Sequence, residues 1–511
     1  MMILKKIAKL LFNRVFYVIF AMAVQLGWLL TIFLRLAGYS RYMSFILDVI
    51  SILVVLKIVN RKINPSYKLA WTMLILCLPI FGLVLYLVFG RSRIAAYMQD
   101  RFNEMLMKSG NLLQTDPEIH DLLEAEDISA CNQSDYIYHN AGYPIHGNTT
   151  AEYFQVGDDM FPVLVRELEQ AQHYIFIEYF IIHDGVMWRT ILDILERKVQ
   201  EGVDVRLIYD DMGCLTTLPH KYYETMRSKG IKCQVFNPFR PILNIIQNNR
   251  DHRKFCIIDG YVGFTGGVNL ADEYINAEQR FGYWKDAALR VEGDAAWNFT
   301  VMFLNFWNAF RPSETDYNAF RPMPLVPPVS DGIVQPYADS PLDEEPMAET
   351  VYLNILAQAQ RYVYIYTPYL AVGEEMLDAL KNAAKRGVDI RLVLPGIPDK
   401  KLVFRLSRSY YLPLLRAGVR IYEYTPGFLH AKCWVSDDVT AVVGSINMDY
   451  RSLFLHFECG VLLQKNSQVA VLRDDVRATL PQCREIQVTE CRTSLPGTVL
   501  DSVLRLLSPL M

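Results

Sequence analysis

Two stretches of the sequence carry the same reactive residue types at the same spacing. Each reads His-x-Lys-x4-Asp, and each continues after six further residues with Gly-x-x-Asn. Chance would produce about 0.02 matches to the first of these patterns in a chain of this composition. The two copies are therefore not accidental. Their residues are His252, Lys254, Asp259 and Asn269 in the first half of the chain, and His430, Lys432, Asp437 and Asn447 in the second.

The pairing of imidazole and ammonium groups indicates chemistry on a phosphoryl group. Side chains alternate along a strand with a period of two, so the His and Lys of each copy point to the same face. Where the two copies meet, the lysines neutralise the phosphoryl oxygens, one neutral imidazole attacks phosphorus, and the other, protonated, donates to the leaving alkoxide. This chemistry requires neither a metal nor a cofactor. Asn269, Asn447 and Ser445 are predicted to bind the substrate phosphate.

Four carboxylates accompany the two copies. Asp259 and Asp437 follow the lysines by five positions, an odd separation that points them to the opposite face of a regular strand, so we interpret them as structural. An imidazole nucleophile also needs a group that orients its other ring nitrogen. Asp286 and Glu458 each open another apolar stretch after the Asn. They are predicted to orient the histidines, the alternative being ordinary carboxylates at strand edges.

Repetition extends beyond the reactive residues and predicts the architecture. Residues 171–180 recur as 359–370, and residues 201–211 recur as 386–396, in the same order as the reactive blocks. Each half reads as strand, amphipathic helix, glycine and buried strand. This pattern predicts an α/β fold of two duplicated lobes, with mixed sheets flanked by helices.

Four regions are expected along the chain. Eight of the 24 prolines fall within residues 312–346, a density that suits a connection between the lobes. The predicted regions are a membrane anchor at 1–92, a linker region at 93–150, a first lobe at 151–325 and a second lobe at 326–511.

The N-terminal region is predicted to be embedded in a membrane. Residues 15–34 and 69–89 are uncharged runs of about 20 residues, the length that crosses a bilayer. The first run is longer than the apolar part of a signal peptide, which favours a retained anchor. Residues 45–56 are too short to cross unaided, so a third crossing and a re-entrant piece both stay open. Near the C-terminus, apolar residues at 499–507 recur at helical spacing, which fits either an interfacial helix or packing against the body.

The overall composition excludes several classes of protein. Hydrophobic residues make up 52% of the chain and charged residues 21%, a balance that intrinsic disorder does not share. The net charge of −4 provides no general attraction to nucleic acid. The nine cysteines include no Cys-x-x-Cys pair, so neither a zinc knuckle nor a disulfide framework is indicated.

The paired motifs resemble those of the phospholipase D superfamily. Together with the hydrophobic stretch at 64–90, they make the chain similar to the bacterial cardiolipin synthases from about residue 60 onward. The resemblance implies a multi-pass protein of the bacterial cell membrane with its catalytic lobes in the cytoplasm. It implies phosphatidyl transfer between two phosphatidylglycerol molecules with release of glycerol, His252 acting as nucleophile and His430 as general acid. The corresponding superfamily motifs are His252/Lys254/Asp259 and His430/Lys432/Asp437.

Three other functions are alternatives to phosphatidyl transfer. A phospholipase D-type phosphodiesterase would hydrolyse the headgroup with the same residues. A nuclease would use them too, but the net charge and the lipid anchor oppose it. A receptor for anionic lipid would not need two intact His and Lys pairs. The residues alone rank neither the two histidines nor phosphatidylglycerol against phosphatidylethanolamine as acceptor.

Overall fold

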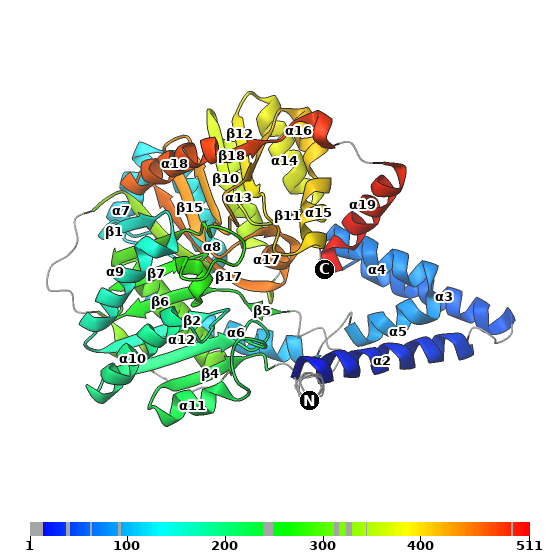
Figure 1. Ribbon diagram of the computed structural model, residues 1–511, viewed down its shortest axis with the longest axis horizontal. Coiled ribbons are helices and arrows are strands. Elements are labelled where there is room, and N and C mark those ends of the chain that lie inside the picture. Colours follow the sequence, from blue (N-terminus) through cyan, green and yellow to red (C-terminus); the bar gives the residue numbers. More distant parts are fainter. Residues whose placement is uncertain are drawn as a thin grey trace, which may run out of the picture.

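The computed structural model shows an arm of helices beside a body of two α/β lobes (Figure 1). It describes residues 14–36, 41–61, 64–89, 93–238, 249–310, 316–322, 330–343, 345–491 and 494–510. The predicted α/β fold with mixed sheets and duplicated lobes is confirmed. The expected boundary between residues 325 and 326 lies outside the described residues.

The first lobe is built on a seven-stranded mixed sheet in the order β1-β8-β7-β6-β2-β3-β4. Its central strand β2 is buried along its whole length, as its apolar sequence requires, and β2 runs parallel to β3 and antiparallel to β6. The strands are β1 (Thr149–Phe154), β2 (Tyr174–Tyr179), β3 (Asp204–Asp210), β4 (Lys232–Phe236), β6 (Lys254–Ile258), β7 (Val262–Gly266) and β8 (Ala288–Gly293). The helices are α9 (Gly157–Gln170), α10 (Val186–Gln200), α11 (Tyr222–Ser228) and α12 (Ala296–Phe310).

The second lobe repeats this plan. Its sheet runs β18-β13-β12-β10-β14-β15-β17, with β9 antiparallel to β17 as β1 is to β8. The strands are β9 (Ile333–Asp339), β10 (Tyr362–Tyr366), β12 (Asp389–Pro395), β13 (Arg420–Tyr424), β14 (Cys433–Ser436), β15 (Thr440–Gly444), β17 (His456–Gln464) and β18 (Cys483–Glu485). The helices are α13 (Met347–Gln358), α14 (Glu374–Lys385), α15 (Lys401–Ser409), α16 (Tyr411–Ala417), α17 (Tyr450–Phe454), α18 (Ser467–Thr479) and α19 (Leu495–Leu507).

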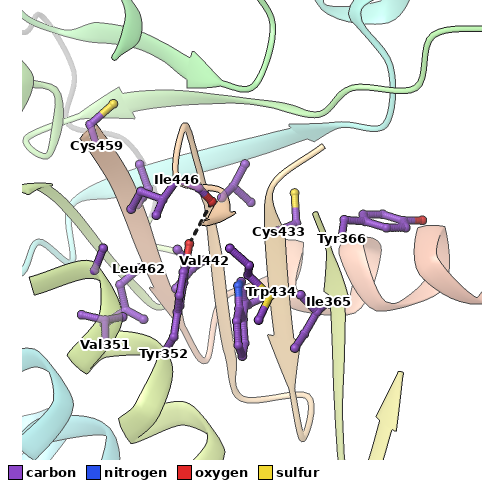
Figure 2. Packing of buried hydrophobic residues seen from close by; sticks show 14 of the residues in the cluster. Val351, Tyr352, Ile365, Tyr366, Cys433, Trp434, Val442, Ile446, Cys459 and Leu462 are labelled. Carbon is purple, nitrogen blue, oxygen red and sulfur yellow. Dashed lines mark hydrogen bonds between the residues drawn. The ribbon is translucent and has the colours of Figure 1, made fainter. Parts of the chain in front are cut away.

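The reactive blocks occupy matched places in the two sheets. Lys254 opens β6, and Lys432 directly precedes β14, the corresponding strand of the second lobe. Under β14, the Trp434 ring stacks on Tyr352 with centroids 4.3 Å apart, and the Tyr352 hydroxyl donates to the carbonyl of Ile446 (Figure 2). An apolar core thus fixes both the strand that carries Lys432 and the loop before Asn447.

The aspartates of the two motifs lie at the far end of these strands. Asp259 has a positive φ of 52°, and its carboxylate accepts hydrogen bonds from the backbone N–H groups of residues 172–174. Asp437, with φ 55°, does the same for residues 360–362. Each carboxylate therefore closes the turn that leads into the central strand of its lobe.

Residues 93–150, expected to be a linker, form helices that pack on the lobes. Phe102 of α6 lies against Phe306 and Phe457, with ring centroids 6.4 and 5.7 Å apart. The Ser134 hydroxyl of α8 donates to Gln464 on β17. The helices of this region are α6 (Arg93–Ser109), α7 (Pro117–Glu126) and α8 (Ile128–Ala141).

Within the described residues, the N-terminal arm has four helices. Residues 69–89 do not form the single span predicted, because the chain turns back at Leu78 and Pro79 into a helical hairpin. Trp71 meets Tyr86 across the hairpin at 5.4 Å, and a Cβ on Gly82 would lie 2.6 Å from the Leu74 carbonyl. The helices are α2 (Arg14–Leu36), α3 (Arg41–Val59), α4 (Pro65–Cys77) and α5 (Pro79–Phe89). Across the described residues, no helix combines the length and apolarity that a membrane crossing requires.

Candidate active site

Backbone pairing between the lobes positions both histidines. The short strand β5 (Arg250–Asp251) adds to the second lobe's sheet in parallel with the start of β17, and the His252 N–H donates to the Phe457 carbonyl at 2.9 Å. The matching contact runs the other way, since the His430 N–H donates to the Lys285 carbonyl at 2.8 Å. Each histidine is therefore held by the lobe that does not carry it.

This exchange brings each imidazole to the other lobe's carboxylate. His252 Nδ1 lies 2.8 Å from Glu458 Oε1, and His430 Nδ1 lies 2.6 Å from Asp286 Oδ2. Both carboxylates are fully buried. Each carboxylate accepts a hydrogen bond from the Nδ1–H of its histidine. The Nε2 lone pair of each ring is then available as the nucleophile or base.

Each lysine lies beside the histidine two positions before it in the chain. Lys254 Nζ donates to the His252 carbonyl at 2.5 Å, and Lys432 Nζ lies 2.9 Å from His430 Nδ1. Burial lowers the pKa of Lys254 to about 8 and that of Lys432 to about 7. Both values lie close to neutral pH, so the charge of these ammonium groups responds to small changes around them.

Burial and the neighbouring ammonium groups also act on the histidines. Burial, followed by Lys254 and Lys432, moves the pKa of His252 well below its usual value, and burial lowers the pKa of His430 to about 4. The influence of Lys432 on His252, and of Lys254 on His430, shows that the two halves form one electrostatic site. Both imidazoles are neutral at pH 7 when no substrate is bound.

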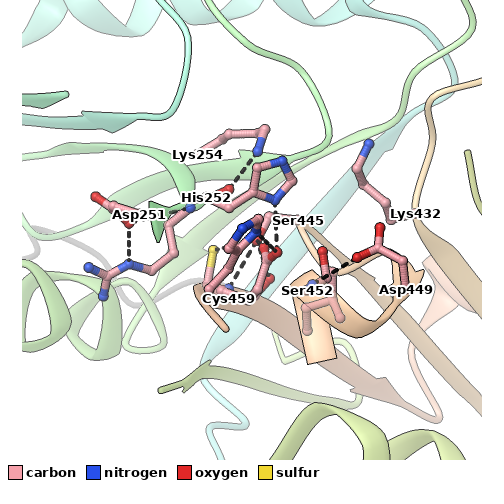
Figure 3. A network of polar contacts seen from close by, with 12 residues as sticks. Asp251, His252, Lys254, Lys432, Ser445, Asp449, Ser452 and Cys459 are labelled. Carbon is pink, nitrogen blue, oxygen red and sulfur yellow. Dashed lines mark hydrogen bonds and ion pairs between the residues drawn. The ribbon is translucent and has the colours of Figure 1, made fainter. Parts of the chain in front are cut away.

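Each orienting carboxylate has its own support. Ser445 donates to Glu458 Oε2 and accepts from the Cys459 N–H, as the network in Figure 3 shows. The position that matches Ser445 in the first half is Gly267, where a Cβ would lie 2.0 Å from Asp286 Oδ1. The shorter aspartate therefore needs the glycine, and the longer glutamate takes a hydroxyl in its place.

Three residues predicted to bind phosphate differ in their surroundings. The Asn269 side chain accepts from the Ile181 N–H and donates to the Tyr274 hydroxyl, so the protein itself uses its amide. Ser445 is engaged with Glu458. Asn447 Oδ1 is buried and has no hydrogen-bond partner among the described residues.

Sequence reasoning missed a buried ionic cluster beneath the first motif. Arg253 points away from its neighbours His252 and Lys254, pairs with Glu178 at 2.6 Å and Asp251 at 3.0 Å, and lies 4.0 Å from the Phe306 ring centroid. Its place between His and Lys, on the opposite face of the segment, was the only signal in the sequence. These contacts hold the segment that presents the first histidine.

Aromatic rings flank both histidines. Trp284 lies 5.4 Å from the His430 ring, and His456 lies 5.5 Å from the His252 ring. Among the described residues, His252, His456 and Glu458 bring possible metal-ligand atoms within 4.8 Å of one another, and a second such group joins α7 to α8 through His120, Cys131 and Asp135. The phosphoryl chemistry derived above uses neither group as a metal site.

This fold and these exchanged pairs define a two-lobed enzyme of the phospholipase D type. The family described as cardiolipin synthase, PLD-like domain, matches residues 164–282 and 352–479, and a family described as phospholipase D-nuclease N-terminal matches residues 46–91. The matched segments carry all six residues of the paired motifs.

Relatives extend the match to nearly the whole chain. A cardiolipin synthase of Halalkalibacterium halodurans is 32% identical over 98% of this chain and all of its own length. Cardiolipin synthase 2 of Bacillus anthracis is 34% identical over 88% of this chain and 87% of its own. An uncharacterized protein of Streptococcus mutans is 41% identical over 89% and 99%. The chain belongs to the cardiolipin synthase family of phospholipase D-like enzymes.

A solved structure shares the fold. Phosphatidylserine synthase from Haemophilus influenzae superposes with a TM-score of 0.56 at 13% identity, covering 74% of this chain and 99% of that protein. The likeness supports the α/β architecture.

We expect Glu458→Gln to lower kcat by about 10²- to 10⁴-fold, because an amide neither fixes the tautomer of His252 nor stabilises its charged form. The change lies in the second lobe, yet it acts on the histidine of the first. Headgroup release from phosphatidylglycerol measures it, and Glu152→Gln on an exposed strand position is the matched control. Full activity of Glu458→Gln would contradict the exchanged pairing.

We also expect kcat/KM for an anionic phospholipid to fall as the pH rises through about 7 to 8. Lys432 and Lys254, with pKa values of about 7 and about 8, lose their charge over this range and no longer attract the phosphate. On the acid side, His252 stays neutral well below its usual pKa, so activity should persist there. Initial rates across pH in mixed micelles test both limbs. An alkaline limb that begins only near pH 10 would be inconsistent with buried lysines.

Proposed function

We propose that this protein makes cardiolipin by transferring a phosphatidyl group from one phosphatidylglycerol to another, through a phosphohistidine. The exchanged pairs His252–Glu458 and His430–Asp286 carry the proposal. They supply two equally prepared imidazoles around one charge-neutralising pair of lysines, which suits a reaction that forms and then breaks a phosphorus–nitrogen bond. The enzyme is a phosphatidyltransferase.

In the first step, His252 Nε2 attacks the phosphorus of the donor lipid while the bond from phosphorus to the glycerol oxygen breaks. His430, protonated, gives its Nε2 proton to that oxygen, so that glycerol leaves as the free alcohol. Burial lowers the pKa of His430 to about 4 in the empty site even with Asp286 beside it, and the negative phosphodiester of the bound lipid favours the protonated form. Lys254 and Lys432 neutralise the charge on the phosphoryl oxygens.

In the second step, a hydroxyl of another phosphatidylglycerol attacks the phosphohistidine. His430, now neutral, takes the proton of that hydroxyl, the phosphorus–nitrogen bond to His252 breaks, and cardiolipin is released. The second step reverses the proton transfer of the first, so His430 serves as the acid in one step and as the base in the other. Water in place of the second lipid would give phosphatidic acid.

The membrane location of the proposed reaction is supported by the apolar arm. Exposed side chains on α2 to α4 are largely aliphatic or aromatic, among them Trp28, Leu53, Leu69 and Leu76. Such a surface is stable where lipid covers it. We infer that the arm embeds the protein in the bacterial cell membrane, that the lobes face the cytoplasm, and that phosphatidylglycerol reaches the site from the bilayer.

The purified protein, incubated with headgroup-labelled phosphatidylglycerol, is expected to yield cardiolipin and free glycerol in equal amounts. Both His252→Ala and His430→Ala should reduce this turnover by at least about 10³-fold. Lipid mass spectrometry and glycerol release provide the measurement, and unfolding curves confirm that the variants fold.

Two outcomes of this experiment would count against the proposal. Phosphatidic acid as the sole product would show hydrolysis in place of transfer. A phosphoenzyme that accumulates in His252→Ala, and is absent from His430→Ala, would reverse the assigned roles. His173→Ala, at an exposed position outside the site, is the matched control.

A further inference from the structure

The C-terminal helix α19 is amphipathic in the reverse of the usual sense. Its two charged residues pair with the lobe: Asp501 accepts from Arg405 on α15 at 2.7 Å, and Arg505 donates to Glu374 on α14 at 3.3 Å. Of its apolar residues, only Leu504 is buried in the lobe. The aliphatic side chains on the outside are Leu495, Val499, Leu500, Val503 and Leu507, with exposed fractions from 42% to 81%.

A helix on the surface of a protein in water normally presents its charges to solvent and its aliphatic side chains to the core. In α19 ionic contacts bind the polar side to the lobe, so the lobe cannot be what covers the apolar side. Arg405 also donates to the Gly497 carbonyl at 3.2 Å, which locks the helix in this orientation.

Helix α19 packs against the N-terminal arm. Figure 1 shows α19 beside α4, and α4 contacts both α19 and the 3₁₀ turn Ser508–Leu510 that follows it. The start of α4 is fixed to the catalytic lobe, because the Ser66 hydroxyl lies 2.9 Å from the Tyr450 hydroxyl and Tyr67 packs edge-on against Tyr450. Leu69 and Leu76 on α4 are exposed aliphatic side chains as well.

We propose that α19 is a second membrane contact, whose aliphatic side lies in the lipid bilayer and holds the second lobe against it. The occupant is lipid because α19 packs on α4 of the arm, whose exposed side chains are also aliphatic, and the proposal rests on the membrane location proposed above. Tyr450 belongs to α17, which begins three residues after Asn447, so this contact and α4 together fix the catalytic site relative to the bilayer surface.

The test compares two forms of the substrate with the full chain. The double variant Val499→Asp/Val503→Asp should lower turnover of phosphatidylglycerol in lipid vesicles on the order of tenfold, because charged side chains enter the interface poorly. Turnover of short-chain phosphatidylglycerol, dissolved as monomers, should not change. Val186→Asp, at an equally exposed valine on α10 of the first lobe, should affect neither substrate.

Each other outcome overturns the proposal. Equal loss on both substrates would make α19 a structural element of the lobe, and no loss on vesicles would show that its apolar side does not meet lipid. A change in molecular mass in detergent would identify a second copy of the chain as the occupant. If the unmodified protein makes no cardiolipin from either substrate, the proposed function fails instead.

A separate observation concerns an asymmetry between two residues that flank the catalytic rings. Trp284 precedes Asp286 by two positions, and His456 precedes Glu458 by two, so the two occupy matched places. Trp284 completes an apolar wall with Tyr274 and with Phe428, each at 4.8 Å between ring centroids. At the matching position beside His252, the imidazole of His456 takes the place of this apolar wall.

The His456 ring is polar and lacks partners. It is only 9% exposed, and neither ring nitrogen has a hydrogen-bond partner among the described residues. Its Nδ1 lies 3.8 Å from Glu458 Oε1, beyond hydrogen-bond distance. Leaving both nitrogens of a buried imidazole unpaired is unfavourable, so this position is built for a polar ligand.

The geometry points to His456 as the residue that binds a glycerol hydroxyl of the substrate. A neutral imidazole offers one donor and one acceptor, and a hydroxyl offers the same pair in return. Its place beside His252 sets the hydroxyl next to the phosphorus that His252 attacks. This inference rests on the proposed function, and it makes His456 a specificity residue for polyol headgroups.

Two donor lipids of equal size separate this role from a structural one. Phosphatidylpropanol has the carbon frame of phosphatidylglycerol without its free hydroxyls. We expect His456→Ala to lower kcat/KM for headgroup release from phosphatidylglycerol about tenfold, the effect of one lost hydrogen bond, and to leave that for phosphatidylpropanol unchanged. His456→Asn keeps a donor and an acceptor, so it should restore part of the preference for phosphatidylglycerol over phosphatidylpropanol. Trp284→Phe should leave the ratio of the two kcat/KM values unchanged.

An equal fall in kcat/KM for both lipids would show that His456 only supports His252. No fall for either lipid would contradict the inference. Should His456→Ala fail to fold, His456→Phe, which keeps a ring and removes both polar atoms, carries the same comparison. Failure of the unmodified protein to release either headgroup would instead count against the proposed function.

Discussion

The contact on which the rest of the site depends is the pairing of each histidine with a carboxylate of the opposite lobe. The backbone bonds from His252 to Phe457 and from His430 to Lys285 set this pairing, because they place Glu458 and Asp286 one residue beyond each acceptor carbonyl. Ring orientation and tautomer follow from these two bonds. The lobes must dock correctly before either imidazole is ready for chemistry.

The same docking lets the protein bury charges that would otherwise be unstable. Two lysines, two carboxylates and two imidazoles are buried, each within reach of an opposite charge or a hydrogen bond. Arg253 with Glu178 and Asp251, and Lys285 with Asp475 across the lobes, extend this network. A site assembled in this way is rigid before substrate arrives, and the lysine pKa values near neutrality follow from its burial.

Sequence reasoning predicted the fold and the family because both follow from residues that repeat at regular spacing. Duplicated blocks predict duplicated lobes, and the spacing of two in His-x-Lys predicts a shared face, as the positions of Lys254 and Lys432 illustrate. Sequence reasoning could not predict that each carboxylate pairs with the histidine of the other lobe, because spacing along a chain holds no information about which lobe a residue contacts. Asn269 was predicted to bind phosphate, but the Tyr274 hydroxyl and the Ile181 amide take up its side chain. The run at 69–89 has the hydropathy of a span, and only Pro79 marks the bend that makes it a hairpin.

The crossed arrangement bears on how such a chain could be divided. A single lobe carries a histidine and the carboxylate that serves the other histidine, so it has all the residue types and no complete pair. Two copies of one lobe, related by a twofold axis, would complete each other and act as a homodimer. Joining them in one polypeptide makes assembly independent of protein concentration. It also allows the halves to diverge, and they differ at the matched positions Gly267 and Ser445, and Trp284 and His456.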